Sequence, residues 1–106
     1  MIIAIDFDDT ITEPSKFPIM GKIREEAIPV IKELKKKHTI ILWTCRTGEY
    51  LQEAIDALKE VDIEFDYIND FPGSGRKIVA DIYIDDRAFN CIIDWNKIKE
   101  ELIDGY

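Results

Sequence analysis

The first twelve residues, MIIAIDFDDTIT (residues 1–12), decide which fold this chain can adopt. The segment Ile2–Ile5 is short, rich in isoleucine and apolar without interruption, which is typical of a strand buried on both faces of a parallel sheet. It is followed at once by three carboxylates, those of Asp6, Asp8 and Asp9. Carboxylates this close together repel one another and resist burial. The stretch is therefore either a solvated turn after a strand or a site that holds a cation.

The composition predicts one globular domain over residues 1–106. This length is enough for one hydrophobic core and too short for a second. Hydrophobic residues make up 46% of the chain and charged residues 34%, which is the balance of a folded rather than a disordered protein. No apolar run approaches the ~20 residues needed to cross a bilayer, and no signal-peptide pattern opens the chain. We therefore expect a cytoplasmic protein without a membrane partner.

The net charge and the cysteines exclude some functional classes. The net charge is -8, whereas nucleic-acid-binding proteins normally present a basic face, so the charge argues against nucleic acid as a partner. Cys45 and Cys91 are too few and too far apart for a zinc site, and we expect free, mostly buried thiols. No histidine lies near Cys45 in the sequence to activate it as a nucleophile. An anionic substrate would have to be attracted by a local positive site.

Beyond residue 12, apolar periodicity predicts helices that alternate with short strands. Thr47 and Asp94 are the expected N-caps of two helices, and Pro29 either kinks another helix or lies in its first turn. This alternation predicts an α/β protein with a doubly wound parallel sheet. We expect a loop over residues 7–22, helices over residues 23–37, 47–60 and 94–102, and strands over residues 2–5, 39–43, 65–68, 82–84 and 91–93.

The carboxylates meet in such a sheet if their strands lie on either side of the point where the strand order reverses. Ligands of doubly wound proteins bind beyond the carboxyl ends of the strands at that point. Asp6 follows the first strand, and Asp85 follows the strand over residues 82–84. If those two strands are neighbours, a hard cation such as Mg²⁺ would relieve the repulsion between the two carboxylates. For Asp6, Asp8 and Asp9 alone, a polar turn remains an equally good interpretation.

Four short motifs occur in order along the chain. They are IIAIDFDDTIT (residues 2–12), ILWTCR (residues 41–46), Lys77, and IYIDD (residues 82–86). Together they resemble the four motifs of the haloacid dehalogenase (HAD) superfamily of phosphatases. In that superfamily an apolar strand and DxDxT come first, a strand ending in Thr or Ser second, a lysine third and paired acids fourth. The resemblance implies a Rossmann-like core of three layers, α/β/α.

The resemblance also implies a Mg²⁺-dependent phosphomonoester hydrolase. Asp6 would be the nucleophile that forms an aspartyl-phosphate. Asp8 would protonate the leaving oxygen and later deprotonate the attacking water, with its backbone carbonyl on the metal. The Mg²⁺ ligands would be Asp6, Asp8 and Asp85, with Asp86 contributing through water. Asp86 could instead be a turn residue that pairs with Arg87.

Three further residues would contact the phosphorylated substrate: Thr44, Lys77 and Arg46. Thr44 would donate a hydrogen bond to a phosphoryl oxygen, or it merely ends a strand. Lys77, with Arg76 as its competitor, would offset the negative charge of the nucleophile and of the phosphate. Arg46 either makes bidentate contacts with an anionic group of the substrate or forms a surface ion pair. Thr10 is expected to fix the turn after the first strand through its hydroxyl.

The chain leaves no room for the cap domain that many members of that superfamily carry. Residues 12–24 hold only a short loop, and residues 59–77 are too few for an inserted domain. We therefore expect an open site, which suits a large substrate or closure by a neighbouring subunit of a homo-oligomer. The loop over residues 13–22 is either a lid, an oligomer contact or a segment folded back on its own core.

Other functions fit the same residues. Receiver-like signalling modules also combine a doubly wound sheet, clustered acids, a Thr and a Lys. Their acceptor aspartate ends the third strand, however, whereas the acids here end the first and fourth. A phosphotransferase and a catalytically silent Mg²⁺-binding domain stay open as well. Nucleotides, sugar phosphates and polynucleotide ends are all candidate substrates.

Overall fold

We describe a computed structural model of the chain that covers residues 1–105. Strands alternate with helices, as the sequence predicts. In chain order the elements are β1 (Ile2–Ile5), α1 (Ala27–Lys37), β2 (Thr39–Leu42), α2 (Gly48–Glu60), β3 (Tyr67–Ile68), β4 (Ile82–Ile84), α3 (Trp95–Lys99) and the π-helical turn η1 (Glu100–Asp104).

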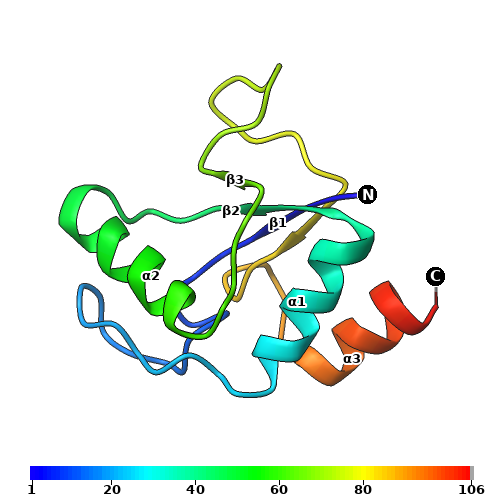
Figure 1. Cartoon of the computed structure of the whole chain (residues 1–106), viewed down its shortest axis with the longest axis horizontal. Helices are drawn as coiled ribbons and strands as arrows, with labels where there is room; N and C mark the ends of the chain where they lie inside the picture. The colour runs from blue at the N-terminus through cyan, green and yellow to red at the C-terminus, as the bar shows by residue number, and fades with distance from the viewer. Residues whose placement is uncertain (106) are drawn as a thin grey trace.

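The strands form one parallel sheet in the order β3-β2-β1-β4 (Figure 1). The chain runs from β1 through β2 to β3 and then returns to the other side of β1 for β4, so the strand order reverses between β1 and β4. Ile3 of β1 pairs with Ile82 of β4, and Ile5 pairs with Ile84. The α/β class and the parallel sheet are therefore confirmed, while the three-layer arrangement that we predicted is not shown.

A single cluster of buried apolar side chains joins the sheet to its helices. Ile3 and Ile5 of β1 are completely buried, and so are Ile31 and Leu34 of α1. Helix α1 packs against β2, α3 and η1, and Figure 1 shows α1 beside α3. Burial of each such side chain stabilises the fold by about 1.5–3 kcal/mol. This core holds the carboxyl ends of β1 and β4 in a fixed relation.

The first helix begins later than predicted, at Ala27 instead of residue 23. The reason is that Ile23 pairs with Thr12 in an isolated antiparallel bridge. Pro29 consequently falls in the first turn of α1, where its missing N–H removes no helical hydrogen bond.

The predicted strand over residues 91–93 is wrong. The backbone N–H of Cys91 donates to the carbonyl oxygen of Ala88 (2.9 Å), so this stretch closes a turn instead of pairing with β4. The helix after it is capped as predicted, because the Asp94 side chain accepts hydrogen bonds from the backbone N–H groups of Asn96 and Lys97.

The loop over residues 13–22 closes on itself at its base, and of its apolar side chains Met20 packs against the core. Its predicted roles as a lid or an oligomer contact stay predictions. The N–H of Glu13 donates to the carbonyl oxygen of Lys22 (2.7 Å) and closes the loop at its base. Gly21 is required there, because a Cβ atom at this position would lie 2.2 Å from the Glu13 carbonyl oxygen. At the tip of the loop, Phe17 and Ile19 remain exposed.

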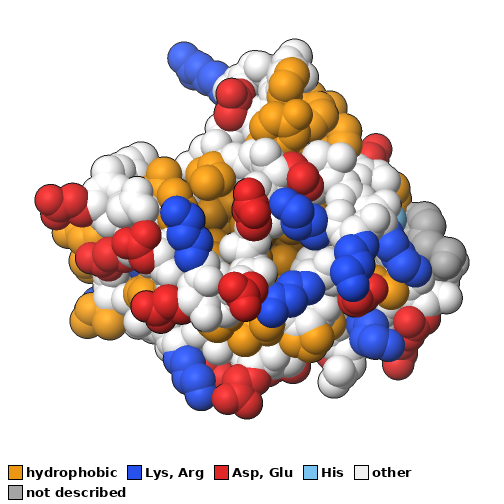
Figure 2. Space-filling view, viewed as in Figure 1, with side chains coloured by type: hydrophobic (Ala, Val, Ile, Leu, Met, Phe, Trp, Pro, Cys, Tyr) orange, Lys and Arg blue, Asp and Glu red, His pale blue; other side chains and the backbone are white. Residues whose placement is uncertain are grey.

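The structure also bears on the predictions for the cysteines, for the charge distribution and for membrane-spanning helices. Cys45 and Cys91 are free thiols, as predicted, but both are exposed instead of mostly buried, because both lie in loops. On the face shown in Figure 2, basic side chains are interspersed with acidic ones and form no continuous basic patch. Among the helices of residues 1–105, none has the length and apolar character needed to span a bilayer.

Candidate active site

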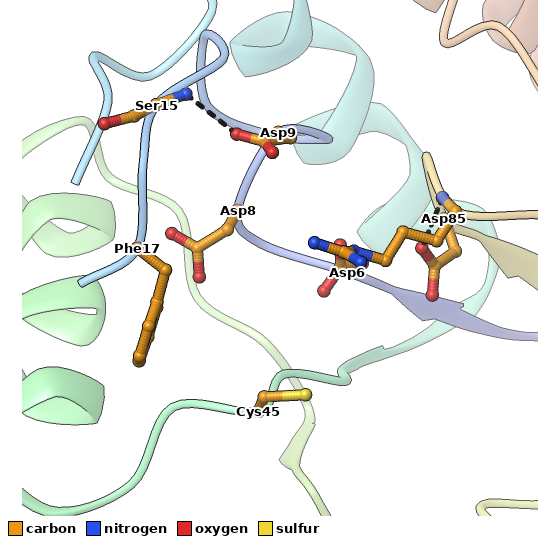
Figure 3. A pocket seen from close by; sticks show the side chains of 8 residues that line it. Asp6, Asp8, Asp9, Ser15, Phe17, Cys45 and Asp85 are labelled. Carbon is orange, nitrogen blue, oxygen red and sulfur yellow. Dashed lines mark hydrogen bonds between the residues drawn. The ribbon is translucent and has the colours of Figure 1, made fainter. Parts of the chain in front are cut away.

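A cavity of about 390 Å³ opens beyond the carboxyl ends of β1 and β4. Figure 3 shows the side chains of Asp6, Asp8 and Cys45 around this space. They come from the loops after β1 and β2, while other lining residues come from the loop over residues 13–22 and from the end of β4. The lining residues are Asp6, Asp8, Asp9, Ser15, Phe17, Cys45, Asp85 and Arg87.

Three carboxylates converge where the strand order reverses. Asp6 follows β1, Asp85 and Asp86 follow β4, and one oxygen of each lies within 4.8 Å of the others. The structure thus brings together three of the four predicted metal ligands. An all-oxygen, anionic donor set of this kind fits a hard divalent cation such as Mg²⁺.

The environment of Asp6 disfavours its negative charge. Burial is the largest cause that raises the pKa of Asp6, from 3.8 to about 7. A side-chain hydrogen bond with Asp86 and the negative charges of Asp85 and Asp86 raise it further, and a backbone hydrogen bond from Phe7 opposes them. The cluster therefore carries more negative charge than its protein surroundings stabilise, which a bound cation would offset.

Thr10 links these carboxylates through a completely buried side chain. Its Oγ1 lies 3.3 Å from Asp6 Oδ2 and 3.1 Å from Asp86 Oδ1, and it accepts a hydrogen bond from the Asp86 N–H (3.1 Å). The hydroxyl has one proton, so it donates to one carboxylate at a time. Trp95 Nε1 donates to the Thr10 carbonyl oxygen (3.1 Å) and holds this residue in place. Thr10 thus orders the cluster in addition to shaping the turn.

Asp8 lines the cavity but lies outside the carboxylate cluster. Arg46 Nε donates to Asp8 Oδ2 (2.8 Å), and Arg46 Nη2 donates to Asp8 Oδ1 (2.7 Å). The Arg46 side chain is completely buried, so the structure supports neither the predicted substrate contact nor the predicted surface ion pair. Arg46 instead forms a buried, bidentate pair with the carboxylate that the resemblance implies as acid and base.

The structure does not bring Thr44 or Lys77 to the cavity. The Thr44 hydroxyl accepts a hydrogen bond from the Arg46 N–H (3.2 Å), and the Thr44 N–H donates to Asn69 Oδ1 (2.8 Å). The Lys77 ammonium lies 5.2 Å from the centre of the Tyr83 ring. Within residues 1–105, Lys77 forms no ion pair with any carboxylate. Their predicted roles in binding substrate stay predictions.

Three lining residues were not predicted: Ser15, Phe17 and Arg87. Arg87 is the basic residue among those that line the cavity, whereas the sequence indicates it only as a possible partner of Asp86. Its position directly after the paired acids of β4 was the signal that could have identified it. Phe17 forms an aromatic wall from the loop over residues 13–22, and only its place between two prolines marked it out.

Comparisons with known proteins give one informative result. No protein-family model and no curated protein matches the chain. A solved structure of a conserved protein from Bacteroides thetaiotaomicron is 40% identical to it, and the match covers 100% of this chain and 92% of that one, with a TM-score of 0.89. The chain therefore belongs to the same protein family as this conserved Bacteroides thetaiotaomicron protein.

Proposed function

We propose that this protein is a Mg²⁺-dependent phosphomonoester hydrolase of the HAD type that works through an aspartyl-phosphate on Asp6. The observation that carries the proposal is the convergence of the Asp6, Asp85 and Asp86 carboxylates within 4.8 Å, beside a cavity that can receive a phosphate ester. The first and fourth sequence motifs, which supply Asp6, Asp8 and Asp85 to the cavity, support the same reaction. A reducing compartment, such as the cytoplasm, would keep Cys45 and Cys91 as free thiols.

The carboxylates of Asp6, Asp85 and Asp86 would hold the cation. When bound, Mg²⁺ would offset the charge of a phosphate and favour the deprotonated form of Asp6. Because the pKa of Asp6 is raised to about 7, its carboxylate is the group of the cluster that such a cation would change most. Arg87 adds positive charge at the cavity, where the other charged side chains that line it are all carboxylates.

The reaction would proceed in two steps. In the first, a carboxylate oxygen of Asp6 bonds to phosphorus while the bond from phosphorus to the alcohol oxygen breaks, and Asp8 gives its proton to that oxygen. In the second, Asp8 takes a proton from water as the water oxygen bonds to phosphorus, and inorganic phosphate leaves Asp6. Lys77 would contribute only if residues 69–81 approached the cavity during this reaction.

Phosphate release from nitrophenyl phosphate tests the proposal. We expect release that requires Mg²⁺, that stops with a chelator, and that falls at least about 1,000-fold in Asp6→Asn. Asp56→Asn is the matched control, because Asp56 is an exposed aspartate of α2 that contacts Gln52. Full activity of Asp6→Asn would contradict the proposal. Added glycerol separates transfer to an alcohol from hydrolysis, since transfer would yield glycerol phosphate.

A binding measurement complements the activity assay. Cys45 lines the cavity whereas Cys91 does not, and both thiols are exposed. We expect Mg²⁺ with inorganic phosphate to slow the alkylation of Cys45 by a thiol reagent and to leave that of Cys91 unchanged. Equal rates at Cys45 with and without phosphate would show that the cavity does not hold the reaction product.

A further inference from the structure

Arg46 is a charged side chain with no exposure to solvent. A buried guanidinium is unfavourable unless its donors are paired. Here Nε and Nη2 donate to the two carboxylate oxygens of Asp8, Nη1 donates to the Tyr50 carbonyl oxygen (3.3 Å), and Nη2 also approaches the Pro18 carbonyl oxygen (3.3 Å). One side chain from the loop after β2 thus joins three separate parts of the chain, which are the turn after β1, the loop over residues 13–22 and the first turn of α2.

The pairing with Asp8 fixes the plane of its carboxylate. A guanidinium fork that bonds both oxygens leaves the carboxylate little freedom to rotate. The Asp8 side chain is 25% exposed, and this exposed part lines the cavity. The buried fork therefore holds Asp8 from behind while Asp8 still faces the space where a substrate would bind.

The same guanidinium supports the aromatic wall of the cavity. Its central carbon lies 5.2 Å from the centre of the Phe17 ring and 5.6 Å from that of the Phe7 ring. Phe17 in turn packs edge to face against Tyr50, with ring centres 5.8 Å apart. The distance between Asp8 and the Phe17 wall is thus set through Arg46.

Anchoring the loop does not by itself account for Arg46, because Arg24 already does so. Arg24 Nε donates to the Thr12 carbonyl oxygen (2.9 Å), and Arg24 Nη2 donates to the Asp9 carbonyl oxygen (2.9 Å). Arg24 contacts backbone oxygens of this loop, whereas Arg46 turns its fork to a carboxylate at the cavity.

We propose that Arg46 is a positioning residue, which holds the Asp8 carboxylate at the cavity so that it can exchange a proton with the leaving oxygen of a phosphate ester. This inference rests on the proposed hydrolase function. It predicts a dependence on the leaving group, because an alkoxide needs protonation as it leaves and a nitrophenolate does not. Loss of Arg46 should therefore impair hydrolysis of an alkyl phosphate more than that of nitrophenyl phosphate.

The test measures kcat and KM for glycerol phosphate and nitrophenyl phosphate in a set of variants. In Arg46→Met we expect kcat/KM, which reports formation of the aspartyl-phosphate and not its hydrolysis, to fall about 100-fold for glycerol phosphate and less than about 10-fold for nitrophenyl phosphate. Asp8→Asn should show the same selectivity, and Arg46→Met added to Asp8→Asn should cause little further loss. Arg46→Lys keeps the positive charge but cannot bond both oxygens of Asp8, so its losses should lie between those of the parent protein and those of Arg46→Met. Arg24→Met, the matched control, should change both substrates by the same factor.

Each outcome decides a different point. Equal losses of kcat/KM for the two substrates in Arg46→Met, or losses of kcat/KM that add to those of Asp8→Asn, overturn the positioning role. If Arg46→Met does not fold, as judged by thermal unfolding, Arg46→Lys carries the same comparison. A protein that hydrolyses nitrophenyl phosphate with Mg²⁺ and Asp6 but shows no selectivity in these variants contradicts this inference alone. A protein that releases no phosphate from either substrate overturns the hydrolase proposal together with it.

Discussion

Two loop segments are held in different ways. Residues 7–24 after β1, the first segment, contribute side chains to the cavity, whereas no residue of 69–81 before β4, the second segment, is among those that line it. In the first segment Thr10 and Thr12 are completely buried, and Arg24 bonds to two backbone carbonyl oxygens of the same segment. Its conformation is thus fixed by the core and by its own polar contacts.

The second segment has few contacts of this kind. Among its residues only Ile78 is buried. Its two ends, Asn69 and Asp81, bond to β2 and β1. Between these ends the hydrogen bonds are local, because the Tyr83 hydroxyl donates to the Ile78 carbonyl oxygen and Ser74 Oγ accepts from the Val79 N–H (3.1 Å). Packing against the core therefore fixes the acidic residues of the first segment. The position of Lys77, in contrast, depends on a segment in which Ile78 is the one residue buried in the core.

The largest expected effect is on stability, when one glycine in each segment is replaced by alanine. In Gly21→Ala the new Cβ would lie 2.2 Å from the Glu13 carbonyl oxygen, so the base of the loop must open. We expect the free energy of unfolding in urea to fall by about 3 kcal/mol. Gly75→Ala meets no atom within 4 Å and should leave that free energy unchanged or raise it by up to about 1 kcal/mol. Equal stability of Gly21→Ala and the parent protein would contradict the tight packing of the first segment.

The pH dependence of stability tests the distance between Lys77 and Asp6. From about pH 3.8 to about pH 7 the folded chain keeps a proton on Asp6 that the unfolded chain releases, because the folded pKa is raised to about 7. The free energy of unfolding should therefore fall as pH rises through this range. Allowing for solvent screening of this partly exposed group, we expect a fall of about 2 kcal/mol relative to Asp6→Asn, measured by urea unfolding with chelator present.

The control for that measurement is Lys77→Met, which should leave the fall unchanged. If Lys77 lay beside Asp6 in solution, its positive charge would lower the pKa of Asp6, and the fall in the parent protein would be small. Lys77→Met would then restore it. If the free energy of unfolding falls only slightly with pH in the parent protein and falls more in Lys77→Met, the second segment reaches the carboxylates of Asp6, Asp85 and Asp86.

The meeting of Asp6 and Asp85 could be predicted from the sequence. Parallel strands align their carboxyl ends, and the reversal of strand order beside β1 brings these two ends together. The prediction required only the strand limits and one topological rule. Thr10 was assigned to the turn, but its contacts with Asp6 and Asp86 depend on the packing of β4 beside β1.

The partner of Arg46 could not be predicted in this way. Asp8 lies 38 residues earlier in the sequence, and the two meet because the loops after β1 and β2 are neighbours. No local pattern indicates whether a charged side chain at a strand end turns toward a cavity or into the core. For residues 91–93, strand-like composition is likewise overruled by the turn from Ala88 to Cys91.

The smallest expected effect is on KM, and it shows whether Arg87 or Lys77 of the second segment supplies positive charge to the cavity. Arg87 lines the cavity, so Arg87→Met should raise KM for nitrophenyl phosphate about 10-fold with little change in kcat. Lys77→Met should leave KM within about twofold, because its ammonium lies over the Tyr83 ring. An unchanged KM in Arg87→Met would contradict its contact with the phosphate. A large loss of kcat in Lys77→Met would mean that the second segment closes over the cavity as the reaction proceeds, since only such a movement brings that ammonium to the phosphate.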